Sequence, residues 1–257
     1  MAATYCFEES KVKKTLAKCK KNDLAVIDCE GIPDEVIIAA VKRGVKIYGY
    51  MNAGALEKER NYYSKFKHIR LAKYDGWPGE YWVNVTNLEW QKHLVSEAKR
   101  LKKLGVIGLY FDNVDIYYMV KEGFEEVDTP MMADIPNGWL TFKALLNVIT
   151  TITMDVGLTV MPNGGDRFVR ALFSLGYGSL IKTVNQEGVL YSDFRATSKE
   201  DRKYFTEYLD WAKSEGLYVR GIEYCKRSDQ ISEAKEYYKR HGWNYCYISK
   251  HHNLEGD

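Results

Sequence analysis

The sequence contains no long apolar run and no excess of charge of one sign. No stretch approaches the roughly 20 apolar residues that a membrane-spanning helix needs, so we expect no membrane insertion. Lys and Arg number 37 and Asp and Glu number 35, which gives a formal net charge of +2. A chain so close to neutrality has no overall field to attract phosphate backbones. Nucleic acid is therefore not an expected partner.

Cysteine is sparse, and a signal peptide is not visible. The five cysteines form no C-x-x-C pair and, being odd in number, cannot all be bridged, so we expect them to act as small buried apolar residues. The opening "MAATYCFEES" lacks the charged-then-apolar pattern of a secretory leader. The sequence as printed is typical of a soluble protein, and export or a cytoplasmic location both stay open.

Several common catalytic motifs are also missing. The sequence has no G-x-S-x-G, no H-E-x-x-H and no glycine-rich phosphate loop of either common spacing. These absences leave carboxylate chemistry, with or without a metal, and give no reason to expect an organic cofactor.

Short apolar stretches rich in Val, Ile and Tyr alternate with helical patterns along the 257 residues. The predicted strands are 4–8, 24–29, 46–52, 108–113, 158–163, 181–186, 218–224 and 244–249. The predicted helices are 10–21, 33–44, 86–104, 138–155, 166–175, 198–215 and 228–241. Thr86 and Glu89 form a capping-box pattern, and Ser198 precedes another apolar stripe at helical spacing.

Alternation of strand and helix over eight units predicts an α/β protein with a parallel sheet, which closes most naturally into a single (β/α)8 TIM barrel spanning 1–257. An open doubly wound sheet is the alternative. The connection 53–87 is unusually long, and connections of this length are usually functional loops or disordered.

Carboxylates stand at the ends of several predicted strands, where barrel enzymes carry their catalytic residues. Any one of them could merely end a strand or cap a turn. Together they predict one acidic rim, and such packed negative charge normally persists because a reaction, a metal or a cationic ligand uses it. The residues are Asp28, Glu30, Asp112, Glu187 and Glu223. We expect Asp28, Asp112, Glu187 and Glu223 to share one cleft.

Aromatic residues suit a sugar ligand, because sugar rings have apolar faces and polar edges. The chain has 20 tyrosines and six tryptophans, several of them in loops expected at the rim. Filling of barrel walls and surface accounts for most of this number. The rim aromatics expected from the sequence are Tyr62, Tyr63, Tyr74, Trp77, Tyr81, Tyr117 and Tyr118.

Four segments together resemble successive motifs of glycoside hydrolase family 114, the endo-α-1,4-polygalactosaminidases, in the bacterial and archaeal branch once labelled cysteinyl-tRNA-synthetase-related. They are "YGYMNAGALEKERNYYSKF", "GEYWVNVTNLEWQKHL", "GLYFDNVDIYY" and "VNQEGVLYSDF". The resemblance covers nearly the whole chain, and no tRNA-synthetase signature accompanies it. It implies a barrel that hydrolyses α-1,4-linked galactosamine-rich polymers, with catalytic carboxylates matching Asp112 and Glu187. The sequence departs from the family at Gln186, which precedes Glu187, and at Pro162 and Asn163, which replace a Lys-Asn pair.

We therefore predict a glycosidase that cleaves an α-linked, galactosamine-containing polysaccharide or oligosaccharide without a cofactor. Asp112 is expected to be the nucleophile of a retaining mechanism, kept at low pKa by the neighbouring Asn113 amide, and Glu187 the acid/base. Glu223 is the alternative nucleophile. The residues expected to bind the sugar are Asp28, Tyr50, Asn52, Asn113, Asp115, Asn163 and Glu223.

Two other functions stay open from the sequence. One is a carbohydrate-binding barrel without catalysis, and the other is a metal-dependent barrel hydrolase with a cation held by Asp28, Asp112 and Asp115. The oligomeric state is not predicted.

Overall fold

Eight parallel strands form the centre of the fold. The computed structural model describes residues 2–122, 137–252 and 254–256. One sheet has the order β1-β2-β3-β7-β8, and a second has the order β13-β12-β9, with parallel pairing throughout both. The strands are β1 (Ala3–Cys6), β2 (Leu24–Ile27), β3 (Lys46–Asn52), β7 (Gly108–Asp112), β8 (Thr159–Pro162), β9 (Thr183–Glu187), β12 (Tyr218–Tyr224) and β13 (Tyr245–Ser249).

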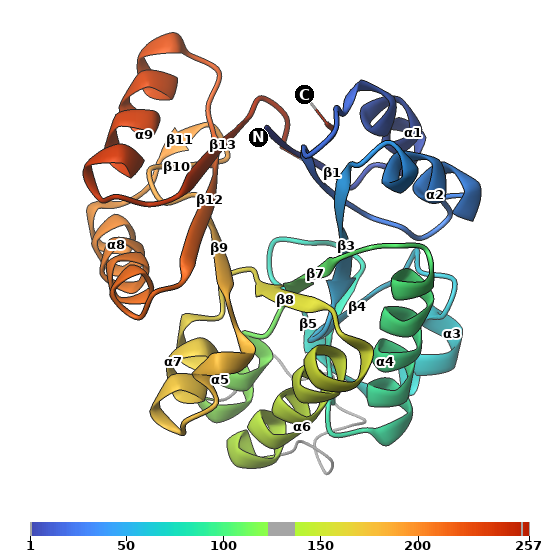
Figure 1. Ribbon diagram of the computed structural model, residues 1–257. Helices are drawn as coiled ribbons and strands as arrows, with labels where there is room; N and C mark the ends of the chain where they lie inside the picture. The colour runs from blue at the N-terminus through green and yellow to red at the C-terminus, as the bar shows by residue number, and fades with distance from the viewer. Residues whose placement is uncertain (1, 123–136, 253, 257) are drawn as a thin grey trace.

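Two seams join these sheets into a closed ring, which Figure 1 shows with the helices outside it. Between β8 and β9, parallel bridges link Val160 to Ile181 and Asn163 to Asn185. Between β1 and β13, the Ala3 N–H donates to the Tyr245 hydroxyl at 2.9 Å. The C-terminal tail also pairs with the first strand, through a bridge between Cys6 and Glu255. The prediction of a (β/α)8 barrel is confirmed.

Helices cover the outer face of the ring (Figure 1). The main ones are α1 (Glu9–Lys18), α2 (Asp34–Lys42), α4 (Leu88–Lys103), α5 (Ile116–Glu122), α6 (Gly138–Thr150), α7 (Asp166–Ser174), α8 (Lys199–Ser214) and α9 (Ser228–Arg240). Short turns add α3 (Tyr63–Phe66), η1 (Lys67–Ile69), the π-helical η3 (Thr151–Val156) and η4 (Gly178–Leu180). Within the described part of the chain, no helix is long and apolar enough to cross a membrane.

The start of α4 differs from the sequence prediction. The Asn87 side chain accepts hydrogen bonds from the backbone N–H groups of Glu89 and Trp90, whereas the Thr86 hydroxyl donates to Asn84. The Thr86–Glu89 capping box is therefore wrong, because Asn is at least as good an N-cap as Thr and stands one residue closer to the helix. The Ser198 cap of α8 is confirmed by its contact with the Asp201 N–H at 3.0 Å.

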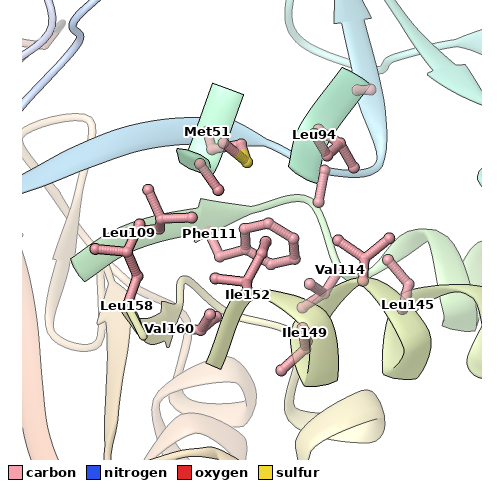
Figure 2. Close-up of a cluster of buried hydrophobic side chains, with 14 of the residues drawn as sticks. Met51, Leu94, Leu109, Phe111, Val114, Leu145, Ile149, Ile152, Leu158 and Val160 are labelled. Atoms are coloured by element: carbon pink, nitrogen blue, oxygen red, sulfur yellow. The ribbon is translucent and has the colours of Figure 1, made fainter. Parts of the chain in front are cut away.

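Strand alternation separates two apolar layers. Side chains such as Leu109, Phe111 and Val160 point outward and pack under the helices, as Figure 2 shows. Side chains such as Tyr110 and Tyr224 belong to a different cluster in the barrel interior. Because neighbouring residues of a strand face opposite sides, this alternation decides which strand-end side chains reach the interior.

The connection 53–87 is folded rather than a bare loop. Its strands β4 (Ala55–Glu57), β5 (Arg70–Lys73) and β6 (Glu80–Val83) form an antiparallel sheet of order β4-β6-β5. The Trp90 indole of α4 is fully buried and donates to the carbonyl of Ala53 at 2.9 Å. This contact anchors the start of the segment to the helix that follows it. A second addition, the hairpin β10 (Tyr191–Ser192) and β11 (Arg195–Ala196), follows β9.

Candidate active site

Asp112 and Glu187 end two strands of the barrel and meet in its interior. Asp112 is the last residue of β7 and Glu187 the last residue of β9, each two positions beyond an inward-facing Tyr110 or Asn185. The Asn163 amide nitrogen donates to Oδ1 of Asp112 at 3.1 Å and to Oε1 of Glu187 at 2.8 Å. Because both oxygens lie within these distances of one nitrogen, they are separated by at most the sum of the two, 5.9 Å.

Each carboxylate accepts three hydrogen bonds. Besides Asn163, Asp112 accepts from the Asn113 backbone N–H at 3.0 Å and lies 3.2 Å from the Tyr50 hydroxyl. Besides Asn163, Glu187 accepts from the hydroxyls of Tyr110, at 2.7 Å, and Tyr224. Both side chains are thus fixed in place before any substrate arrives.

The protonation of Asp112 differs from the sequence expectation. Removal of its carboxyl group from water and the nearby charge of Glu187 raise the pKa of Asp112 to about 8. The expected Asn113 contact fails to lower it, because the Asn113 amide donates instead to Asn52 and Glu80 and only its backbone N–H reaches Asp112. At neutral pH, Asp112 of the free protein therefore carries a proton.

Asn163 is itself held by an interior network. Its Oδ1 accepts from the amide of Asn185 at 2.8 Å, and Asn185 is fully buried and accepts from the Tyr5 hydroxyl at 3.2 Å. This contact turns the Asn163 nitrogen toward the two carboxylates. Asn163 was expected to bind sugar, and the structure places it as the bridge of the pair. Asn185, Tyr110 and Tyr224 were missed by the sequence analysis, although strand alternation points all three inward.

A cavity of about 530 Å³ opens beside the pair. Among the residues that the structure describes, six carboxylates line it and Arg167 is the one cation that does. The acidic residues are Asp112, Asp115, Asp166, Glu187, Glu200 and Asp201. Among them, Asp115 accepts from the Gly165 N–H at 3.1 Å, and burial together with the charge of Asp166 raises the pKa of Asp115 to about 6. Such a lining favours a cationic ligand.

Asp28 lies elsewhere. Its carboxylate pairs with Arg60 at 2.6 Å, and Arg60 also contacts Glu30 at 2.9 Å and Glu57 at 2.6 Å. Asp28 lines a second cavity rather than the one that holds Asp112 and Glu187. The expectation of one shared cleft thus holds for Asp112 and Glu187 and is wrong for Asp28, because the arginine of the long β3–α4 connection draws that carboxylate aside.

The proposed cation site is not assembled either. Asp28 is separated into the second cavity, and across 2–122, 137–252 and 254–256 no group of three or more His, Cys, Asp or Glu side chains lies together as metal ligands would.

Tyr50 contacts Asp112 directly, and Asn52 accepts a hydrogen bond from Asn113, the residue after Asp112. The Tyr50 hydroxyl lies 3.2 Å from both Asp112 and Glu57. Asn52 is 3% exposed and donates to Glu57 at 3.1 Å and to Glu80 at 2.8 Å. Burial and the charge of Glu57 raise the pKa of Glu80 to about 7. Glu80 was not expected from the sequence, yet it holds both Asn52 and Asn113 in place.

Glu223 does not reach the cavity, so its expected place in a sugar subsite or as nucleophile is wrong. It is fully buried and accepts from the backbone N–H groups of Leu190 and Tyr191 and from the Tyr238 hydroxyl of α9. Strand alternation turns Glu223 toward the helices and points the next residue, Tyr224, into the barrel. Glu223 instead fixes the start of the loop that follows Glu187.

Comparisons with known proteins point to one family. A family model described as glycoside-hydrolase family GH114 matches residues 4–256. An uncharacterized protein of Thermotoga maritima is 23% identical over 250 residues, which span 87% of this chain and 72% of that protein.

Two solved structures share the fold. The glycoside hydrolase domain of PelA from Pseudomonas aeruginosa superposes with a TM-score of 0.74 at 15% identity, covering 99% of this chain and 96% of that one. Ega3 of Aspergillus fumigatus, solved in complex with galactosamine, gives a TM-score of 0.71 at 14% identity, covering 99% and 92%.

The raised pKa of Asp112 predicts how the stability of the protein depends on pH. Its pKa in the folded protein, about 8, is above the value of about 4 in an unfolded chain, so the folded protein binds the extra proton between these values. Stability conferred by this group is therefore lost as pH rises through that window. Asp112→Asn removes this loss, and we expect its stability relative to wild type to increase by at least about 1 kcal/mol between pH 5 and pH 9.

Urea unfolding at both pH values measures this difference. The exposed Asp155→Asn is the matched control, and its difference from wild type should not vary with pH. A constant difference for Asp112→Asn as well would contradict the raised pKa.

Proposed function

The chain belongs to glycoside-hydrolase family GH114, and on that premise we propose that it cleaves α-1,4-linked, galactosamine-containing polysaccharide with Asp112 and Glu187 as its two catalytic carboxylates. The proposal rests on the distance between the carboxylate oxygens of Asp112 and Glu187. The facing oxygens lie at most 5.9 Å apart, and retaining glycosidases need about 5–5.5 Å, whereas inverting ones need about 6.5–9.5 Å to admit a water. The pair therefore supports retention of the anomeric configuration.

The hydrogen-bond donors support different roles for the two groups. Two of the three donors to Asp112, the Asn113 backbone N–H and the Asn163 amide, can only donate, which suits a carboxylate that stays a fixed acceptor during attack. Two of the three partners of Glu187 are tyrosine hydroxyls, which can donate or accept. Glu187 can thus be satisfied with or without its proton, as an acid/base must be.

The proposed reaction has two steps. Glu187 gives a proton to the leaving glycosidic oxygen while Asp112 attacks the anomeric carbon and forms a glycosyl ester. Glu187 then removes a proton from water, which attacks the same carbon and releases Asp112. Because Asp112 is protonated in the free protein, that proton must pass from Asp112 to Glu187 before the first step, which leaves Asp112 ionised and supplies the proton that Glu187 gives.

The acidic lining supports an amino sugar as the substrate. A galactosamine ammonium group placed among the six carboxylates would be attracted to them, and its charge would favour the ionised form of Asp112. Ega3, which has a similar fold, was solved in complex with galactosamine, an amino sugar. Substrate entry would in this way prepare the nucleophile.

Product stereochemistry tests the proposal most simply. Purified protein is incubated with α-1,4-galactosamine polymer, and proton NMR follows the first product formed. We expect the α-anomer first. An initial β-anomer would exclude Asp112 as nucleophile, and no cleavage of any galactosamine polymer would favour a barrel that binds carbohydrate without cleaving it.

Substitution of each carboxylate tests the roles. Asp112→Asn should lower kcat by at least about 10⁴-fold on every substrate, because no nucleophile remains. Glu187→Gln should lose less on an aryl glycoside whose leaving group needs no proton, about 10²-fold, and azide should restore part of its second step. Asp155→Asn should leave kcat unchanged. If azide restores activity to Asp112→Asn and the product is inverted, Asp112 is still the nucleophile. If Asp112→Asn is fully active without azide, Asp112 is not a catalytic residue.

The pH dependence gives a separate test. The profile of kcat/KM reports ionisations of the free enzyme. The first step needs one proton on the pair, so kcat/KM should fall up to tenfold per unit above about pH 8, where Asp112 loses that proton. Deacetylated and N-acetylated substrates are compared, since a limb common to both cannot come from the substrate amine. A profile that keeps rising above pH 8 would contradict the raised pKa of Asp112.

A further inference from the structure

The loop that follows Glu187 folds back on itself as the β10–β11 hairpin, which lies against β12 (Figure 1). Gly188 has a φ of +63°, and a Cβ atom at this position would lie 2.8 Å from the Cβ of Ser192. The Thr197 hydroxyl donates to the Gly188 carbonyl at 2.6 Å. The base of the hairpin is thus closed directly against the residue that follows Glu187.

The tip of this hairpin has an unfavourable backbone conformation. Its two residues, Asp193 and Phe194, have φ values of +48° and +62°. A two-residue turn with both φ values positive normally has glycine in its second position, and a residue with a bulky side chain rarely adopts this conformation. Such strain persists where surrounding contacts hold it, and it is frequent at functional sites. Contacts of the Phe194 ring must therefore offset the strain of the turn.

Two neighbours hold the Phe194 ring. The ring packs perpendicular to that of Tyr224, with centroids 6.4 Å apart, and the Lys226 ammonium lies 4.0 Å from the Phe194 centroid. The other residue of the turn is held as well, because the Asp193 carboxylate lies 3.1 Å from Nδ1 of His252 in the C-terminal tail. The tip of the hairpin is thus fixed against Tyr224, whose side chain belongs to the interior cluster of the barrel.

Tyr224 connects the hairpin to Glu187. Asn163 and Tyr110 both donate to Oε1 of Glu187. The Tyr224 hydroxyl donates to the other oxygen, Oε2. Because Oε1 already accepts from two donors, the proton that Glu187 gives to the leaving group is best carried on Oε2, where the Tyr224 hydroxyl can turn to accept it. The position of Tyr224 therefore affects the oxygen that transfers the proton.

We propose that Phe194 is a positioning residue for Glu187, which it orients by packing on the Tyr224 ring. This inference rests on the proposed function, in which Glu187 is the acid/base. Phe194 acts through the Tyr224 hydroxyl, which sets the direction of Oε2 and of the proton that Oε2 carries. Loss of the Phe194 ring should therefore slow the reaction where proton transfer to the leaving group is needed.

The dependence on the leaving group separates positioning from a general loss of structure. Protein carrying Phe194→Gly is compared with wild type on α-1,4-galactosamine polymer and on an aryl glycoside whose leaving group needs no proton. Glycine adopts positive φ without strain, so the hairpin backbone should keep its conformation. We expect kcat/KM to fall about tenfold on the polymer and less than about twofold on the aryl glycoside. Equal losses on both substrates, or no loss on the polymer, overturn the proposal.

A double-mutant cycle tests whether Phe194 acts through the Tyr224 hydroxyl. Tyr224→Phe keeps the ring and removes the hydroxyl, and alone it should lower kcat/KM on the polymer about tenfold. Adding Phe194→Gly to Tyr224→Phe should cost less than about twofold more, because residues that act through one contact are not additive. An undiminished effect of Phe194→Gly in the double variant overturns the proposal. Tyr218→Phe, an exposed change at the opposite end of β12, is the control and should leave kcat/KM unchanged.

Carbon NMR of the Tyr224 ring gives a readout that needs no substrate. The chemical shift of the Tyr224 Cζ responds to the hydrogen bond of the attached hydroxyl, and loss of the signal in Tyr224→Phe identifies it. Phe194→Gly should shift this signal, whereas Tyr218→Phe should not. An unshifted Tyr224 signal in Phe194→Gly overturns the proposal.

The two proposals fail in different ways. If wild type cleaves no polymer but Phe194→Gly still shifts the Tyr224 signal, the proposed function falls and the positioning of the Tyr224 hydroxyl by Phe194 stands. If wild type and Phe194→Gly cleave the polymer with equal kcat/KM, the positioning role falls and the proposed function stands.

Discussion

The geometry of the site depends on one amide, the Asn163 side chain, which donates to two carboxylates at once. Two neighbouring carboxylates repel each other when both are ionised, and a donor shared between them offsets part of that repulsion. The bridge keeps Asp112 and Glu187 within 5.9 Å while leaving one proton on Asp112. Asn185 and Tyr5 fix the orientation of the amide from the barrel interior, so the geometry of the site is determined well below its surface.

The barrel and the proximity of Asp112 to Glu187 could be predicted from the sequence because both depend on local signals. Alternating apolar stretches and helical stripes mark the eight units, and Asp112 and Glu187 each end a strand. The same rule about strand ends gives the wrong result for Glu223. It also ends a strand, but alternation along β12 turns it toward α9 and sends Tyr224 inward instead. Assigning an inward or outward direction to each residue of the strand would have predicted Tyr224, instead of Glu223, in the barrel interior.

The remaining differences come from contacts between distant segments, which no local pattern records. Arg60 lies in the long β3–α4 connection and draws Asp28 away from the catalytic cavity. Glu80, from the same connection, takes the Asn113 amide that was expected to lower the pKa of Asp112. The small antiparallel sheet of this connection thus changes both the membership of the site and its protonation. Its folding could not be derived from length and composition alone.

Trapping of the covalent intermediate would show directly whether Asp112 attacks the anomeric carbon. A 5-fluoro galactosaminyl fluoride with the α-configuration slows the second step of a retaining glycosidase more than the first, so the glycosyl ester accumulates. Peptide mass spectrometry then locates the added sugar. We expect the label on Asp112, with none in a protein carrying Asp112→Asn. A label on Glu187, or on neither residue while the substrate is still consumed, would contradict it.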